Sequence, residues 1–182
     1  MKIETTNIPG VIVLTPRVFG DERGFFLESY NKMVFQQAGI KSDFVQDNHS
    51  SSSQGVIRGL HYQKKYPQGK LIRVIHGEVL DVIVDIRRGS PTFSKWTSIQ
   101  ITAANKKQVW IPPGLAHGFS VLSTTAEFIY KVTDYYHPED EAGIRWDDPQ
   151  LNIDWQVQNP QLSEKDAKLP LLADVEKELP KI

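Results

Sequence analysis

From residue 44 to residue 133, the chain is a succession of short segments that favour β-strands. They are enriched in β-branched and aromatic residues, and glycine, proline or serine separates most of them from the next. Many short strands at regular spacing are typical of an all-β sandwich or barrel. The expected strands cover residues 44–49, 56–62, 71–75, 79–86, 96–102, 108–111, 118–122 and 127–133.

The flanking segments predict less regular structure. Residues 11–14 predict a strand, residues 21–24 predict a charged turn, and Asn31 can cap a helix that Gly39 would close. After residue 136 we expect a long ordered loop and then short helical turns from Ser163. The chain therefore predicts one domain over residues 1–182, with an N-terminal strand region (1–43), a barrel core (44–135) and a C-terminal tail (136–182) that packs on the barrel.

The strand expected at residues 79–86 shows period-two alternation. Leu80, Val82 and Val84 lie on one apolar face, whereas Asp81 and Asp85 lie on the other. Such alternation is typical of a strand with one buried face.

Composition excludes several classes of protein. The 182 residues carry a net charge of −1, which does not favour binding to DNA or to an anionic membrane. The absence of cysteine excludes disulfides, thiolate nucleophiles and cysteine metal sites, and it fits a reducing compartment. The first residues, MKIETTNIPG, contain no apolar run of signal-peptide length, and nothing approaches the ~20 apolar residues of a membrane span. We expect a soluble cytoplasmic protein without nucleic-acid or membrane partners.

Residues 55–78 concentrate groups that can carry chemistry. His61 is a candidate general base because the pKa of imidazole, ~6.5, lies near working pH, although a hydrogen-bonded structural histidine is the alternative. Arg58 and His61 are three residues apart, so in a regular strand their side chains would point to opposite faces. A bulge at Gly59 would turn both toward one pocket; without it, Arg58 would serve another surface, such as the pocket of a partner subunit.

Lys70 begins the next expected strand and shares parity with Ile72 and Val74. Most lysines are solvated. A lysine that points inward on an apolar face would instead stabilise a negative charge, such as a developing enolate.

A second dense motif, PPGLAHGF, covers residues 112–119 and places His117 just after a tight turn. His61, His76 and His117 could be proposed as metal ligands. However, Gln63 stands two positions after His61, and no carboxylate follows at ligand spacing. We therefore expect no catalytic metal.

Tyr130 and Asp166 each have a structural and a functional interpretation. Tyr130 could be a core residue with its hydroxyl satisfied, or a general acid toward an enolate carbon. Asp166 could close a capping box with Ser163, or orient a histidine and stabilise its imidazolium.

Seven stretches together resemble one known family. They are DERGFFLE (21–28), QDNHS (46–50), GVIRGLHYQ (55–63), PQGKLIRVIHGEVLDVIVDIRRGSPTF (67–93), IPPGLAHGF (111–119), YKVTDYYHPEDEAGIRWDDP (130–149) and SEKDAKLP (163–170). In order and spacing, over nearly the whole chain, they are similar to the dTDP-4-dehydrorhamnose 3,5-epimerases of the cupin superfamily.

The resemblance implies a double-stranded β-helix (cupin jelly roll) with a few short peripheral helices, and a homodimer that exchanges N-terminal strands. It implies no cofactor and no metal. The implied substrate is dTDP-4-dehydro-6-deoxy-D-glucose, which is epimerised at C3 and C5 to dTDP-4-dehydro-L-rhamnose in dTDP-L-rhamnose biosynthesis.

Position by position, the resemblance also implies roles. His61 matches the base, Asp166 its carboxylate partner, Lys70 the residue beside the 4-keto oxygen, and Tyr130 the acid. Tyr136 matches the aromatic residue that stacks on thymine. The other substrate-contacting positions match Arg23, Glu28, Gln46, Asn48, Arg58, His117, Glu141 and Lys168.

Three alternatives stay open. A relative could invert only C3 or only C5, or could move the ketone between C3 and C4. A non-catalytic cupin could bind sugars or a metal. Tyr130 favours epimerisation, because inversion needs a proton donor on the face opposite the base.

Overall fold

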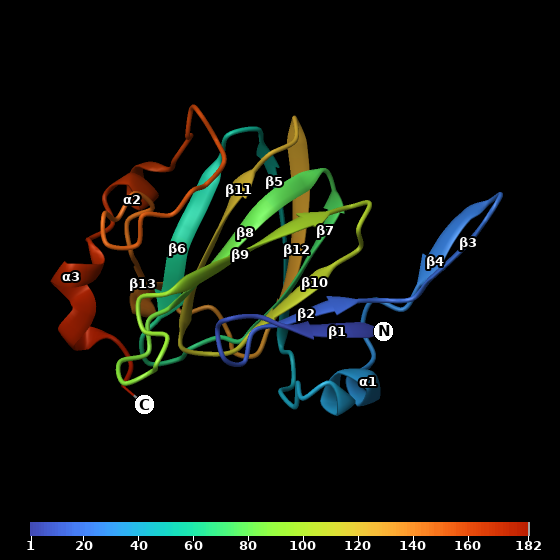
Figure 1. Ribbon diagram of the computed structural model, residues 1–182, viewed down its shortest axis with the longest axis horizontal. Helices are drawn as coiled ribbons and strands as arrows, with labels where there is room; N and C mark the ends of the chain where they lie inside the picture. Colours follow the sequence, from blue (N-terminus) through green and yellow to red (C-terminus); the bar gives the residue numbers. More distant parts are fainter. Residues whose placement is uncertain (182) are drawn as a thin grey trace.

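The computed structural model describes residues 1–181, and two antiparallel sheets that face each other dominate it (Figure 1). The six-stranded sheet has the order β1 (Lys2–Thr5), β2 (Ile12–Thr15), β10 (Gln108–Ile111), β7 (Lys70–His76), β12 (Thr125–Val132) and β5 (Gln46–Ser53). The five-stranded sheet has the order β13 (Glu141–Gly143), β6 (Ile57–Gln63), β11 (Leu115–Val121), β8 (Glu78–Asp85) and β9 (Trp96–Thr102).

Successive strands mostly alternate between the two sheets. The chain passes from β5 to β6, β7 and β8, and later from β10 to β11, β12 and β13, by changing sheets at each step. Double-sheet jelly rolls are built in this way. The all-β jelly roll is thus confirmed, and its short helices lie at the periphery (Figure 1).

The core between the sheets receives residues from both of them. From β8 it takes Val79 and Ile83, whereas Leu80, Val82 and Val84 pack in a second core on the outer face of the five-stranded sheet. The C-terminal tail covers that outer face. The expectation of one buried face on β8 is therefore wrong: the face that carries Asp81 is buried against the six-stranded sheet, the tail covers the apolar face, and the five residues are at most 3% exposed.

A short N-terminal helix covers the opposite flank of the barrel. Helix α1 (Lys32–Gln37) begins after Asn31, whose side chain accepts the N–H groups of Met33 and Val34 as predicted. A third core joins Phe35 to Leu14 and Leu71 of the six-stranded sheet.

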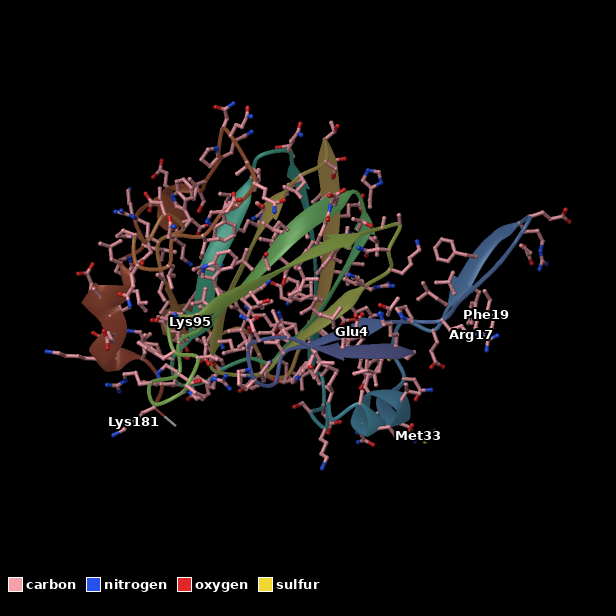
Figure 2. All side chains as sticks on the ribbon, in the orientation of Figure 1. Glu4, Arg17, Phe19, Met33, Lys95 and Lys181 are labelled. Carbon is pink, nitrogen blue, oxygen red and sulfur yellow. The ribbon has the colours of Figure 1, made fainter. Side chains whose placement is uncertain are left out.

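A two-stranded hairpin projects away from the barrel (Figure 1). It consists of β3 (Val18–Asp21) and β4 (Gly24–Leu27), joined at the predicted charged turn. Figure 2 shows the hairpin standing clear of the barrel, although the Phe25 ring centroid lies 3.9 Å from Lys106 Nζ of the loop between β9 and β10. Phe19, Phe25 and Phe26 are 49%, 60% and 68% exposed, so the hairpin leaves large apolar side chains uncovered.

The tail begins with a 3-10 turn at Pro138–Asp140 and carries α2 (Glu164–Ala167), α3 (Leu172–Val175) and a second 3-10 turn at Glu176–Glu178. Over residues 1–181, every helix is too short or too polar to cross a membrane.

Candidate active site

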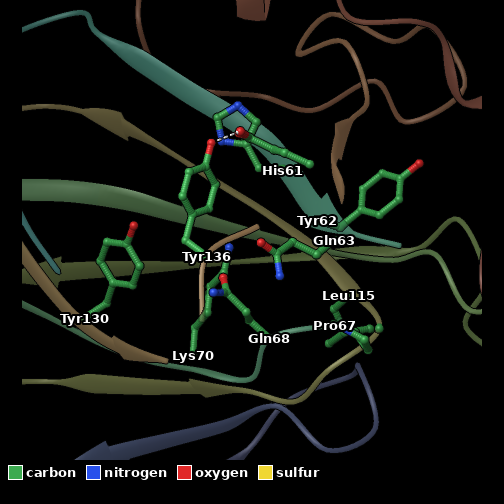
Figure 3. Close-up of a pocket in the computed structure, with 11 residues that line it drawn as sticks. His61, Tyr62, Gln63, Pro67, Gln68, Lys70, Leu115, Tyr130 and Tyr136 are labelled. Carbon is green, nitrogen blue, oxygen red and sulfur yellow. Dashed lines mark hydrogen bonds between the residues drawn. The ribbon is translucent and has the colours of Figure 1, made fainter. Parts of the chain in front are cut away.

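A pocket lies between the two sheets, and both contribute to its walls. Two hollows of ≈ 520 and ≈ 780 Å³ share His61, Lys70 and Tyr130. His61 comes from β6 in the five-stranded sheet, whereas Lys70 on β7 and Tyr130 on β12 come from the six-stranded sheet (Figure 3). The fold thus brings the three side chains into one cavity from facing walls.

Asp166 stands behind His61. Nε2 of His61 lies 2.6 Å from Oδ1 of Asp166, a carboxylate 105 residues later in the chain. Burial raises the pKa of Asp166, but hydrogen bonds from His61 and from the Gly59 N–H lower it by more. The pKa of Asp166 therefore lies below its usual value. An ionised carboxylate here orients the imidazole by accepting a hydrogen bond from Nε2, and it leaves the second ring nitrogen, Nδ1, free to take a proton.

The structural interpretation of Asp166 holds as well. The Asp166 N–H donates to Ser163 Oγ at 3.0 Å, which caps α2 at its first turn. Since the cap uses the backbone of Asp166, its carboxylate is available to His61.

The predicted bulge separates Arg58 from His61. His61 pairs with His117 and Arg58 pairs with Phe119, so a three-residue step on β6 opposes a two-residue step on β11. Gly59 lies inside this step with φ +116°, and a Cβ there would lie 2.6 Å from Gly118 Cα. Only glycine fits this conformation and this close approach. As a result, Arg58 and His61 line the same hollow.

Arg58 is held by a residue that the sequence reasoning did not single out. Its Nε donates to Ser52 Oγ at 3.1 Å, and Ser52 is 9% exposed on β5. The guanidinium and Asn48 line the larger hollow. A planar guanidinium in such a place suits a phosphate.

Lys70 lies where the two hollows meet. Burial lowers its pKa from 10.5 to about 8, and the nearby carboxylates Asp81 and Glu141 only partly oppose this. Lys70 is thus mostly a charged ammonium at neutral pH, but it loses its proton at a lower pH than a surface lysine does. His76 does not join it, because an irregularity in β7 beside Val74 leaves His76 exposed at the strand end.

Tyr130 remains protonated over a wide pH range. Burial and the charge of Glu141 raise the pKa of its phenol, and the charge of Arg58 opposes them less strongly. A protonated phenol that reaches the cavity from the sheet facing His61 can donate a proton.

His117 has a buried acidic partner, Asp81, that the sequence reasoning placed on a polar face. His117 Nε2 lies 2.7 Å from Asp81 Oδ2, and Asp81 is entirely buried. Burial lowers the pKa of His117 more than Asp81 raises it, so the neutral imidazole is favoured. A carboxylate between Leu80 and Val82, in a strand rich in apolar residues, was the available signal, because a buried charge requires a partner.

Tyr136, Glu141 and Lys165 form a polar cluster at the edge of the smaller hollow. The Tyr136 hydroxyl donates to Glu141, drawn as a dashed line in Figure 3, and Lys165 Nζ lies 2.5 Å from Glu141 Oε2. The bond to Glu141 raises the pKa of Tyr136 to about 12. Burial raises the pKa of Glu141, but Lys165 and Tyr136 lower it below its usual value.

Four more expected contact residues divide into two groups. Gln46 lines neither hollow, but it donates to Asn48 at 2.8 Å and accepts the Tyr136 N–H at 3.3 Å, and both of these residues line one. Arg23 pairs with Asp21 on the projecting hairpin. Glu28 bonds Asn31, and Lys168 lies 3.7 Å from Glu164 at the surface. Within one chain, Arg23, Glu28 and Lys168 do not line the two hollows.

The part of the chain that the structure describes has no group of three or more His, Asp or Glu side chains arranged to hold a metal ion. Gln63, which stands two positions after His61, has its side-chain amide bonded to backbone groups.

Comparison with known proteins identifies the family. A family profile described as dTDP-4-dehydrorhamnose 3,5-epimerase matches residues 5–174. The dTDP-4-dehydrorhamnose 3,5-epimerase of Shigella flexneri is 58% identical over 168 residues, which cover 91% of this chain and 93% of that protein. The chain belongs to the dTDP-4-dehydrorhamnose 3,5-epimerase family.

Solved structures agree with this assignment. The dTDP-6-deoxy-D-glucose-3,5-epimerase of Legionella pneumophila Philadelphia 1, in complex with dTDP-4-keto-L-rhamnose, is 51% identical with a TM-score of 0.96, and the match covers 100% of this chain and 98% of that one. A 3′-monoepimerase of Streptomyces bikiniensis, in complex with dTDP-quinovose, is 32% identical with a TM-score of 0.91, covering 97% and 91%. The 3,5-epimerase family therefore shares its fold with an enzyme described as acting on one centre.

Proposed function

We propose that this member of the 3,5-epimerase family inverts C3 and C5 of dTDP-4-dehydro-6-deoxy-D-glucose and forms dTDP-4-dehydro-L-rhamnose for dTDP-L-rhamnose biosynthesis. Hydrogens at both carbons are α to the C4 ketone, so removal of either gives an enolate with its charge on O4. The observation that carries the proposal is that a histidine paired with an aspartate enters the cavity from one sheet, and a tyrosine and a lysine enter it from the facing sheet.

Each group has one task in this mechanism. His61 takes the proton from carbon, and Asp166 stabilises the imidazolium that forms. Lys70 stabilises the developing charge on O4 as a hydrogen-bond donor held in place before the reaction. Tyr130 returns a proton to the opposite face of the carbon, which inverts it. The same set acts on C3 and on C5, and no hydride moves.

The remaining pocket residues divide the substrate between them. Arg58 suits the diphosphate because its fork can bond two phosphate oxygens, with Asn48 beside it. Tyr136, half exposed at the edge of the cavity, presents a ring for the thymine. Gln46, His117 and Glu141 would contact the sugar nucleotide from the walls between them.

Incubation with the keto sugar nucleotide in D2O tests the reaction. Because each inversion takes its new proton from the enzyme, which exchanges with solvent, the product should carry deuterium at C3 and at C5. Proton NMR would report both the labelled positions and the stereochemistry. Inversion at one carbon only would replace this proposal with a monoepimerase, and release of no deuterated product at all would indicate a binding protein.

We also propose a homodimer in which the β3–β4 hairpin reaches the partner subunit. The exposed Phe19, Phe25 and Phe26 on a projecting two-stranded ribbon support it, because a lone apolar hairpin is unstable in water. Arg23 and Glu28, which lie outside their own pocket, would then approach the partner's. Phe26→Asp should shift the mass measured by light scattering from dimer to monomer; a dimer retained at low micromolar concentration would contradict this arrangement.

A further inference from the structure

The side chain of Gln63 holds together two loops at the edge of the cavity. Its Nε2 donates to the carbonyl oxygens of Tyr66, at 2.6 Å, and Tyr135, at 3.4 Å. Its Oε1 accepts the N–H of His137 at 2.9 Å. Gln63 is 8% exposed, so these backbone groups would lose their bonds without gaining water. Figure 3 shows its amide between the strand of His61 and the side chains of the cavity.

The bonds from Gln63 to Tyr135 and His137 lie on either side of Tyr136 along the chain. One goes to the carbonyl of the residue before it and the other to the N–H of the residue after it. The N–H of Tyr136 itself donates to Gln46. The backbone that carries the Tyr136 ring is therefore fixed from β6 and from β5, while the ring remains at the cavity edge.

The neighbouring contacts strengthen this connection. The buried carboxylate of Asp140 accepts the N–H groups of Lys65 and Tyr66, at 2.8 and 2.9 Å. The rings of Tyr66 and His137 stack with centroids 4.3 Å apart. The loop after β6 and the loop that carries Tyr136 thus form one unit, and Gln63 anchors it to the strand of the proposed base.

We propose that Gln63 is a positioning residue for the nucleoside end of the substrate: its amide sets the place of Tyr136 and, through Tyr136, the affinity for the thymidine diphosphate group. The role rests on the proposed function, because it assumes that Tyr136 contacts the base. Gln63 lines the smaller hollow, but its amide is bonded to three backbone groups, so it acts on binding rather than on proton transfer.

The chemistry of the site selects an amide. Two carbonyl oxygens and one N–H require a side chain with two donors and one acceptor on one end. Glutamine supplies them, a neutral histidine has one donor and one acceptor, and a glutamate has no donor. Methionine has nearly the length and shape of glutamine without these bonds, so Gln63→Met removes the tether and preserves the volume.

The test measures the Kd of dTDP by calorimetry, and kcat and KM for the keto sugar nucleotide, in wild type, Gln63→Met, Tyr136→Ala and the double variant. Ser120→Ala is the matched control, because Ser120 is also a buried polar residue and gives one hydrogen bond to a loop carbonyl, that of Trp155, away from the cavity. Gln63→Met should raise the Kd and the KM about tenfold and leave kcat within about threefold. Ser120→Ala should lower the melting temperature and leave all three constants unchanged.

The double variant separates positioning from general stability. If Gln63 acts through Tyr136, Gln63→Met should change the Kd by less than about twofold once Tyr136 is alanine. Equal losses in both backgrounds, an unchanged Kd, or a loss in kcat without a rise in KM would each overturn the assignment. Wild-type protein that binds no dTDP would refute the proposed function and this role together, whereas normal wild-type binding and activity beside a normal Gln63→Met would refute this role alone.

Discussion

The charge on Lys70 makes the pH dependence of the reaction a direct test of the site. With a pKa of about 8, Lys70 is about 90% protonated at pH 7 and about 10% protonated at pH 9. If the ammonium stabilises the enolate, kcat/KM should therefore fall about tenfold per pH unit above pH 8. A lysine with the ordinary pKa of 10.5 would give no such decline below pH 10.

The other groups around Lys70 do not produce this decline in kcat/KM above pH 8. The pKa values of Tyr130 and Tyr136 are raised, the second to about 12, and that of His117 is lowered. The carboxylate of Glu141 has a lowered pKa and is ionised throughout. A decline centred near pH 8 would thus report the loss of the proton from Lys70.

Two substitutions make the assignment specific. Lys70→Arg keeps a cation that does not lose its proton, so its profile should stay flat to pH 10 even if its rate is lower. Lys70→Met removes the donor to O4 and should lower kcat at pH 7 by about 10²–10³-fold. Lys95→Met, at an exposed position away from the cavity, serves as the control (Figure 2). A wild-type kcat/KM that stays constant from pH 7 to pH 10 would refute the reasoning. The same decline above pH 8 in Lys70→Arg would also refute it.

Three further outcomes are expected. Removing the base with His61→Ala should lower turnover by about 10²–10⁴-fold, and Asp166→Asn should lower it by a comparable factor because the imidazolium loses its counter-charge; full activity in either would contradict the pairing. Tyr130→Phe keeps His61 intact, so substrate hydrogens should still exchange in D2O while inverted product falls at least about 10²-fold; unchanged inversion would remove Tyr130 from its role. Gly59→Ala places a methyl group 2.6 Å from Gly118 Cα at a positive φ, and denaturant unfolding should show about 2–4 kcal/mol less stability; a stable variant would argue against the bulge.

Much of the barrel could be predicted from local patterns. The strand pattern and the turns between strands follow from alternating side chains and from turn residues, which act over a few neighbours. The bulge in β6 could also be predicted locally. Arg58 and His61 can face the same pocket only if one residue between them is an extra, unpaired residue of a bulge.

The environment of β8 could not be predicted in this way. Its Asp81 looked like a residue of a polar face, but it lies inside the barrel against His117. Whether a strand face meets solvent depends on what the rest of the chain places over it. Here the six-stranded sheet covers the face that carries Asp81, and residues from the C-terminal tail cover the other face.

The amino-acid sequence by itself determined the order of the short strands between residues 44 and 133, the glycine at the bulge and the kinds of groups available for proton transfer, because these depend on each residue and its near neighbours. The tertiary structure alone decided that Asp166 meets His61 across 105 residues, that Tyr130 and Lys70 face them from the other sheet, and that burial lowers the pKa of Lys70 to about 8. Distances through space and removal of water from a charge arise only when the sheets close on each other, and no local pattern carries them.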